Sequence, residues 1–248
     1  MRELKIGVQL WTLRDELKTD FKGTMRKLAE LGFDGVEFAG DYGGMPPKEL
    51  AAFMGGLRLG CAGIMPGAAN ILDTGSIAYE YAESLKAPAL TTSDMEPFDE
   101  KLDEITKRCA ALGEAAASMG IRYSYHNHAG EFVKINGECA LDLLYRHTDA
   151  KQVMAELDIY WIAKGGQDPV EYIKKHSARL LQAHFKDMDP VDGSFTELGN
   201  GCLDLAACLE AVRKTNCEWV IYEQDECKRH PLESAAISVQ CLKKLWRR

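Results

Sequence analysis

The sequence lacks several features that would place it at once in a common class of protein. No stretch reaches the roughly eighteen apolar residues of a membrane span, and the first residues contain no apolar leader with a small-residue cleavage site. The eight cysteines are scattered and include no C-x-x-C pair. We therefore expect a soluble, cytoplasmic protein whose thiols are reduced, with no membrane partner.

Basic residues and glycine-rich phosphate loops are also in short supply. Lys and Arg number 30 against 38 Asp and Glu, a formal charge of -8, which repels rather than gathers a phosphate backbone. No G-x-G-x-x-G or Walker loop follows the first apolar run. These shortages argue against a nucleic-acid partner and against a dinucleotide fold.

What the sequence does contain is a regular alternation of strand-like and helix-like segments. Eight short, β-rich apolar runs recur about every 31 residues. They begin at Lys5, Gly35, Gly60, Ala89, Arg122, Val153, Leu180 and Trp219. Amphipathic helical patterns separate them, with stop signals such as Gly32 and start signals such as Asp168-Pro169. Eight βα repeats in 248 residues without a linker predict a single (β/α)8 TIM barrel, one domain over residues 1–248.

Polar side chains gather where the predicted strands end, which is where a barrel builds its site. The last four strands each finish on a residue type that binds divalent cations: His126, Asp158, His184 and Glu223. Each has an ordinary alternative, as a helix cap, a solvated acid or a buried core histidine. Four consecutive strands with this ending favour the functional interpretation.

Neighbouring residues extend this candidate site. By the two-residue period of a strand, His126 and His128 share a face, and so do His184 and Lys186. Glu131 follows in HNHAGEF and is close enough to fold back over the strand end. Trp11 and Trp161 are candidates for an apolar wall against a sugar ring, although such aromatic residues more often pack the barrel.

Several motifs, in order along the whole chain, resemble one superfamily. They are IGVQLWTLRDEL, LGFDGVEFAG, YHNHAGEF, ELDIYWIAKGGQDP, HFKD, LGNGCLDL and WVIYEQDE. The chain resembles the xylose isomerase-like TIM barrels, the sugar phosphate isomerases/epimerases, and particularly the branch that includes inosose dehydratase.

The resemblance implies one divalent metal ion, Mn, Mg, Co or Zn, held at the ends of the fifth to eighth strands. Asp158, His184 and Glu223 match the last three ligands. Many relatives have Glu where this chain has His126, so either His126 replaces that ligand or Glu131 supplies the carboxylate from the loop. We expect Glu131, because it keeps three carboxylates at the metal.

The remaining roles follow the same resemblance. The expected catalytic residues are Glu223, His126, Lys186 and His128, and the expected substrate-binding residues are Gln9, Trp11, Glu37, Asn127 and Trp161.

The implied activity is that of a metal-dependent sugar isomerase or epimerase, which removes a proton next to the carbonyl of a ketose or keto-sugar. Two alternatives stay open: a dehydratase or lyase on a keto-inositol or 3-keto-glycoside, and a noncatalytic sugar-binding or partner subunit. The nuclease branch, endonuclease IV, is disfavoured, because Glu37 and Met65 stand where it needs histidines. The sequence does not indicate an oligomeric state.

Overall fold

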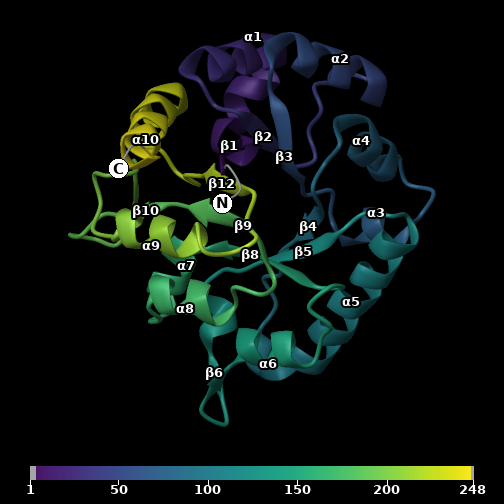
Figure 1. The fold of residues 1–248 in the computed structure, drawn as a ribbon, viewed down its shortest axis with the longest axis vertical. Helices are drawn as coiled ribbons and strands as arrows, with labels where there is room; N and C mark the ends of the chain where they lie inside the picture. The colour runs from purple at the N-terminus through teal and green to yellow at the C-terminus, as the bar shows by residue number, and fades with distance from the viewer. Residues whose placement is uncertain (1–3, 247–248) are drawn as a thin grey trace.

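The computed structural model describes residues 4–246 and shows eight parallel strands closed into a barrel inside a ring of helices (Figure 1). Around the barrel the strands follow the order β1-β2-β3-β4-β5-β8-β9-β12, and β12 pairs with β1 to close it. The strands are β1 Lys5–Gln9, β2 Gly35–Phe38, β3 Gly60–Ile64, β4 Leu90–Thr92, β5 Tyr123–His126, β8 Met154–Asp158, β9 Leu180–Phe185 and β12 Trp219–Tyr222. Each falls within one of the eight predicted runs, so the predicted TIM barrel is confirmed.

The helices connect the strands and cover the outside of the barrel (Figure 1). They are α1 Arg14–Leu31, α2 Pro47–Leu57, α3 Ala68–Leu72, α4 Ile77–Leu85, α5 Phe98–Ser118, α6 Ala140–Arg146, α7 Ile159–Lys164, α8 Pro169–Lys175, α9 Leu205–Val212 and α10 Pro231–Trp246. The predicted signals act as expected at two ends: Gly32 closes α1 with φ 84°, and the Asp168 carboxylate caps α8 at Val170 and Glu171. None of the helices in this part of the chain is both long and apolar enough to cross a bilayer.

Several short elements lie in the loops that follow the barrel strands. Two 3₁₀ turns lie in the loops after β1 and β5: η1 Leu10–Leu13 and η2 Gly130–Phe132. Two small antiparallel ladders lie in the loops: β6 Lys134–Ile135 with β7 Glu138–Cys139, and β10 Asp187–Met188 with β11 Phe195–Thr196.

The interior of the barrel divides into an apolar floor and a polar upper part. Trp219, Ala62 and Ile221 form the floor, a cluster separate from the main core. Gly35 leaves space for the Trp219 ring, because a Cβ there would lie 2.6 Å from its Cη2 atom. Above the floor the buried residues are Ser124, Glu156, Gln182 and other polar side chains, where barrels ordinarily stack branched apolar ones. The strands therefore deliver polar groups well below the mouth of the barrel.

Candidate functional site

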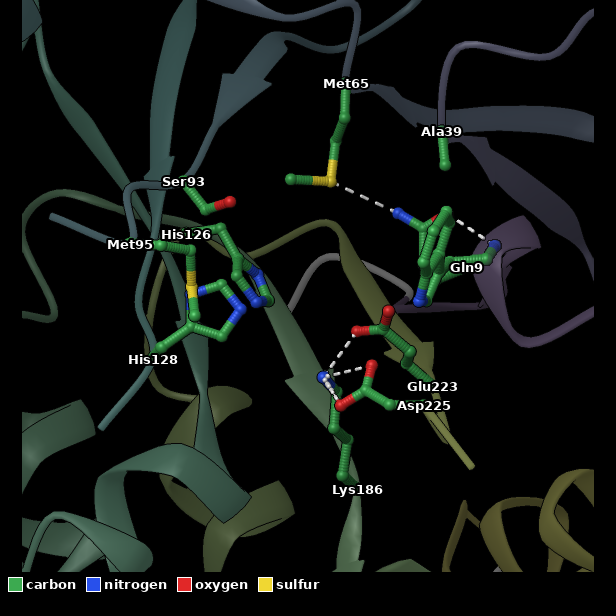
Figure 2. Close-up of a pocket in the computed structure, with 11 residues that line it drawn as sticks. Gln9, Ala39, Met65, Ser93, Met95, His126, His128, Lys186, Glu223 and Asp225 are labelled. Carbon is green, nitrogen blue, oxygen red and sulfur yellow. Dashed lines mark hydrogen bonds and ion pairs between the residues drawn. The ribbon is translucent and has the colours of Figure 1, made fainter. Parts of the chain in front are cut away.

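A pocket of about 330 Å³ opens at the carboxyl end of the strands (Figure 2). Polar residues from β1, β5, β9 and β12 and their following loops line its depth, and Ala39, Met65 and Met95 contribute apolar surface near its mouth. The lining residues are Gln9, Trp11, Ala39, Met65, Ser93, Met95, His126, His128, Lys186, Glu223 and Asp225. Six of the predicted site residues therefore face one cavity.

Four of the deepest side chains converge as a group of metal-ligand types. His126, Asp158, His184 and Glu223 each offer one ligand atom, and these four atoms lie within 4.8 Å of one another. All four residues are buried, and they come from the ends of four neighbouring strands, β5, β8, β9 and β12. Two imidazoles and two carboxylates on rigid elements form a donor set that suits a divalent cation.

The two carboxylate oxygens of Asp158 have different surroundings. Its Oδ1 atom caps α7 by accepting from the amides of Tyr160 at 2.9 Å and Trp161 at 3.0 Å. Its Oδ2 atom is buried and accepts no hydrogen bond from any described residue, although Lys186 Nζ forms an ion pair with it at 3.2 Å. A buried carboxylate oxygen left open in this way has the character of a metal ligand.

The two histidines of the group each direct one nitrogen away from the other donors. His126 Nδ1 lies 3.1 Å from Glu156 Oε1, and His184 Nε2 lies 3.1 Å from the same oxygen. His184 Nε2 is also 2.7 Å from Glu37 Oε2. A partner for the outer nitrogen is what metal-bound histidines usually have. The donor set and its surroundings therefore both fit a metal ion.

Glu37 and Glu156 lie side by side in the barrel, and ionising both of them would cost electrostatic free energy. Burial, and then the neighbouring Glu156, raise the pKa of Glu37 to about 8. Burial alone also disfavours charge on Glu156, but His184 and His126 hold the pKa of Glu156 well below its ordinary value. At neutral pH the pair therefore consists of a protonated Glu37 and an ionised Glu156.

Lys186 is a buried cation that three carboxylates surround. Its Nζ atom lies 2.8 Å from Glu223, 3.0 Å from Asp225 and 3.2 Å from Asp158, and dashed lines in Figure 2 join it to Glu223 and Asp225. Burial opposes its charge, yet these carboxylates raise the pKa of Lys186 above its ordinary value. Burial and the adjacent Glu223 raise the pKa of Asp225 to about 6. Asp225 is therefore the carboxyl group of this cluster that takes up a proton most readily.

His128 provides a neutral imidazole at the side of the pocket. Burial, and then the nearby His126, lower the pKa of His128 to about 3, so its ring is uncharged at neutral pH. Its Nδ1 atom is buried and has no hydrogen-bond partner among the described residues. The ring lies 5.3 Å from that of Trp161, whose Nε1 atom is also buried and unpartnered. A neutral imidazole that lines a pocket can accept a proton or a hydrogen bond.

Two of the predicted site residues, Glu131 and Asn127, neither line the pocket nor belong to the donor group. Glu131 is not in the donor group: it is buried in η2, where its Oε1 atom accepts from the Tyr125 hydroxyl at 3.0 Å. Glu131 therefore does not belong to the donor group, and the member of that group from the fifth barrel strand is His126. Asn127 faces away from the pocket, because its side chain bonds the backbone of Asp158. Trp11 lines the mouth but is 48% exposed.

Sequence reasoning missed Glu156, Gln182 and the role of Asp225. Glu156 precedes Asp158 by two residues, and Gln182 precedes His184 by two. The two-residue period of a strand places both on the same side as the residues that follow them. That signal was available for Glu156 and Gln182, and it identifies them as a second layer beneath the donor group.

Glu37 has a different position from the substrate contact that we expected. It is completely buried, and its Oε2 atom accepts from Gln9 Nε2 at 2.8 Å. It does not line the pocket. Glu37 therefore belongs to the layer beneath the site, and Gln9 connects that layer to the cavity.

Comparison with known proteins agrees with this architecture. Residues 25–245 match the family described as Xylose isomerase-like TIM barrel. An inosose dehydratase of Lactiplantibacillus plantarum is 27% identical, with 86% of this chain and 84% of that protein aligned. The rhizopine catabolism protein MocC of Rhizobium meliloti is 25% identical over 99% of this chain and 89% of its own length.

Solved structures give the same fold over almost the whole chain. A sugar phosphate isomerase/epimerase from Parabacteroides distasonis superposes with a TM-score of 0.80 at 22% identity and covers 97% of this chain and 98% of its own.

Against several other inosose dehydratases the alignment spans about half of their length, for example 52% of the Lacticaseibacillus casei protein. Inosose dehydratase is the name of an enzyme, and the match of residues 25–245 places this chain in the xylose isomerase-like TIM barrel family.

Proposed function

We propose that this protein is a divalent-metal-dependent isomerase or epimerase that removes a proton next to the carbonyl of an unphosphorylated keto-sugar. The observation that carries the proposal is the convergence of His126, Asp158, His184 and Glu223 within 4.8 Å beside the pocket. A neutral histidine and a buried Lys-Asp pair line the same cavity. Acid, base and ligand groups are thus within reach of one small substrate.

The metal would be held by His126, Asp158, His184 and Glu223. When bound, such a cation polarises a carbonyl oxygen and makes the adjacent C–H bond more acidic. The open Oδ2 atom of Asp158 and the outer nitrogens of both histidines, already engaged by carboxylates, support this assignment. Mn, Mg, Co and Zn are all compatible with a site of two imidazoles and two carboxylates.

Two groups are available to move the substrate proton. Glu223 stays ionised, because Lys186 and His184 hold its pKa well below the ordinary value against the effect of burial, and it lines the pocket. His128 is neutral and lines the same pocket, so its imidazole is available as a proton acceptor. A base on one side and a proton carrier on the other are the requirement for epimerisation. Lys186 lines the pocket beside Glu223 and stabilises the charge of that carboxylate.

A second outcome of the same proton removal is elimination, as in a dehydratase or lyase. Loss of a β-hydroxyl or glycosidic oxygen requires an acid that protonates the leaving group. Asp225 lines the pocket, and its pKa of about 6 lets it carry a proton near neutral pH. This observation favours the elimination alternative on a keto-inositol or 3-keto-glycoside, and the inosose dehydratase relatives agree with it.

The proposal of an unphosphorylated substrate rests on the engagement of the nearest phosphate-binding groups. Lys186 is the cation among the described residues that line the pocket, and it already contacts three carboxylates. Arg14 donates to the carbonyls of Trp11 and Asp225. The amides of Gly199 and Gly201 both donate to Asp187.

The test is proton exchange in deuterium oxide, followed by NMR on ketoses, keto-inositols and 3-keto-glycosides with metal-loaded and chelated protein. Chelator-sensitive deuterium incorporation without net elimination is the expected result. A dehydrated or unsaturated product would replace the epimerase assignment by the lyase assignment. No bound metal and no exchange with any substrate would refute the enzyme proposal and favour a sugar-binding subunit.

A further inference from the structure

We propose that Glu156 is a positioning residue that orients both histidine ligands through a single carboxylate oxygen, so that the two histidines present unlike nitrogens to the metal. This inference rests on the metal site proposed above. It adds a residue outside the donor group and a chemical detail, the tautomer of each ring, that can be measured separately from activity.

The register of the barrel places Glu156 between the two rings. Glu156 pairs directly with His126 across β5 and β8, whereas Asp158, two residues further on, pairs with His184 across β8 and β9. Strand alternation then puts both carboxylates on the inner face, with Glu156 one layer deeper. Glu156 is completely buried, so its contacts are with protein groups and not with solvent.

The contacts at Oε1 decide which nitrogen of each histidine is engaged. Glu156 Oε1 lies 3.1 Å from His126 Nδ1 and 3.1 Å from His184 Nε2. An ionised carboxylate oxygen only accepts, so Glu156 Oε1 favours hydrogen on both of these nitrogens, and His184 Nε2 shares its hydrogen with Glu37 Oε2 at 2.7 Å. His126 is thereby left to ligate through Nε2, and His184 through Nδ1.

The remaining nitrogens do face the other donors. His126 Nε2 is 3.8 Å from Asp158 Oδ2, and His184 Nδ1 is 2.9 Å from Glu223 Oε2. Ligation through Nε2 of His126 and Nδ1 of His184 therefore agrees with the positions of Asp158 and Glu223.

Glu156 is itself held on its far side. The Thr91 hydroxyl donates to Glu156 Oε2 at 3.3 Å, which leaves Oε1 for the two histidines. Glu37 Oε2 also lies 2.7 Å from His184 Nε2. His126 Nδ1 has no side-chain partner besides Glu156 among the described residues. Loss of Glu156 should therefore disturb His126 more than His184.

The first experiment measures metal affinity in the variant Glu156→Gln. Glutamine keeps the size of the side chain, but its Oε1 atom carries no charge, so the hydrogen bonds that it accepts from the imidazoles are weaker than those of the carboxylate. We expect the dissociation constant for Zn²⁺ to rise by about 10- to 100-fold, the usual effect of losing an outer partner of a ligand. The control is Asp142→Asn, which alters another buried carboxylate that contacts a histidine, His176 at 2.8 Å, but lies outside the pocket.

The outcomes separate this inference from the proposed function. Weakened binding in Glu156→Gln, with the control unchanged within about twofold, supports the positioning role. Wild-type affinity in Glu156→Gln overturns that role and leaves the metal site intact. Absence of Zn²⁺ binding by the wild-type protein overturns the proposed metal site, and with it this inference.

A second measurement needs no substitution and so does not depend on how a variant folds. Long-range ¹H–¹⁵N spectra of the Zn²⁺-loaded wild-type protein report which ring nitrogen of each histidine carries hydrogen. We expect hydrogen on Nδ1 of His126 and on Nε2 of His184. The same tautomer on both rings would overturn the proposal.

Discussion

The dual use of Asp158 allows one residue to be tested for two separate roles. Its Oδ1 atom caps α7 through the amides of Tyr160 and Trp161, and its Oδ2 atom is the open ligand. Asparagine is as good an N-cap as aspartate, so Asp158→Asn keeps the cap and removes the charge. Asp158→Ala removes both. Comparing the two variants therefore separates helix stability from metal binding.

The expected magnitudes follow from these contacts. Loss of the cap costs about 1 kcal/mol, within a range of about 0.5–2. For a chain of this size that lowers the melting temperature of Asp158→Ala by roughly 2–4 °C below that of Asp158→Asn. Both variants should bind Zn²⁺ more than about 100-fold more weakly than wild type, because even an outer partner of a ligand contributes about 10- to 100-fold.

Calorimetry in chelator measures the cap, and a Zn²⁺ titration measures the ligand. The stability difference is read between the two variants, so the shared loss of charge beside Lys186 cancels. Zn²⁺ affinity of Asp158→Asn within tenfold of wild type would refute the assignment of Oδ2 as a ligand. Equal melting temperatures of the two variants would refute the energetic role of the cap.

Three further substitutions test other parts of the account. Lys186→Met leaves the surrounding carboxylates without their cation and should lower the free energy of unfolding in chelator by about 3–5 kcal/mol. Denaturant titration should show a smaller loss of stability when Zn²⁺ is saturating. An equal loss in both conditions would contradict the proposal that the metal and Lys186 use the same carboxylates. His128→Asn should keep the affinity for Zn²⁺ within about threefold of wild type. It should reduce the rate of deuterium exchange by about 10²- to 10⁴-fold, the usual contribution of a general acid or base. Exchange at the wild-type rate would exclude His128 from proton transfer. His176 and Lys175 hold the pKa of Asp142 well below its ordinary value despite burial. The stability that Asp142 contributes is therefore present above about pH 4 and is lost as the pH falls through the lowered pKa. Melting temperatures should therefore fall more steeply below pH 4 in wild type than in Asp142→Asn, and parallel curves would contradict this.

The barrel was predictable because its strands are buried on both sides. Parallel strands of this kind read as continuous apolar runs, and the helices between them carry clear stop signals such as Gly32. The same property limits what the sequence says about the interior. When both faces are buried, polarity alone does not tell which side of Val153–Asp158 points into the barrel, and Glu156 is identified only by its two-residue spacing from Asp158.

Strand alternation explains the outcome for the residues after β5. The H-x-H spacing predicts that His126 and His128 share a face, and their rings lie 5.2 Å apart. The same alternation puts Asn127 on the other side, where it bonds the backbone of β8, so its expected contact with substrate was inconsistent with the pattern. Glu131 lies beyond the strand, and the 3₁₀ turn that carries it beneath Tyr125 leaves no periodic signal in the sequence.

The central claim is that one divalent cation binds among His126, Asp158, His184 and Glu223. A crystal structure of the Zn²⁺-loaded protein, with anomalous scattering at the zinc edge, tests it most directly. We predict one peak at about 2.0–2.2 Å from His126 Nε2, Asp158 Oδ2, His184 Nδ1 and a Glu223 oxygen. A second group of three candidate ligands, Glu37, Glu156 and His184, lies deeper in the barrel. A peak in that group, or one bound by Glu131, would contradict the account.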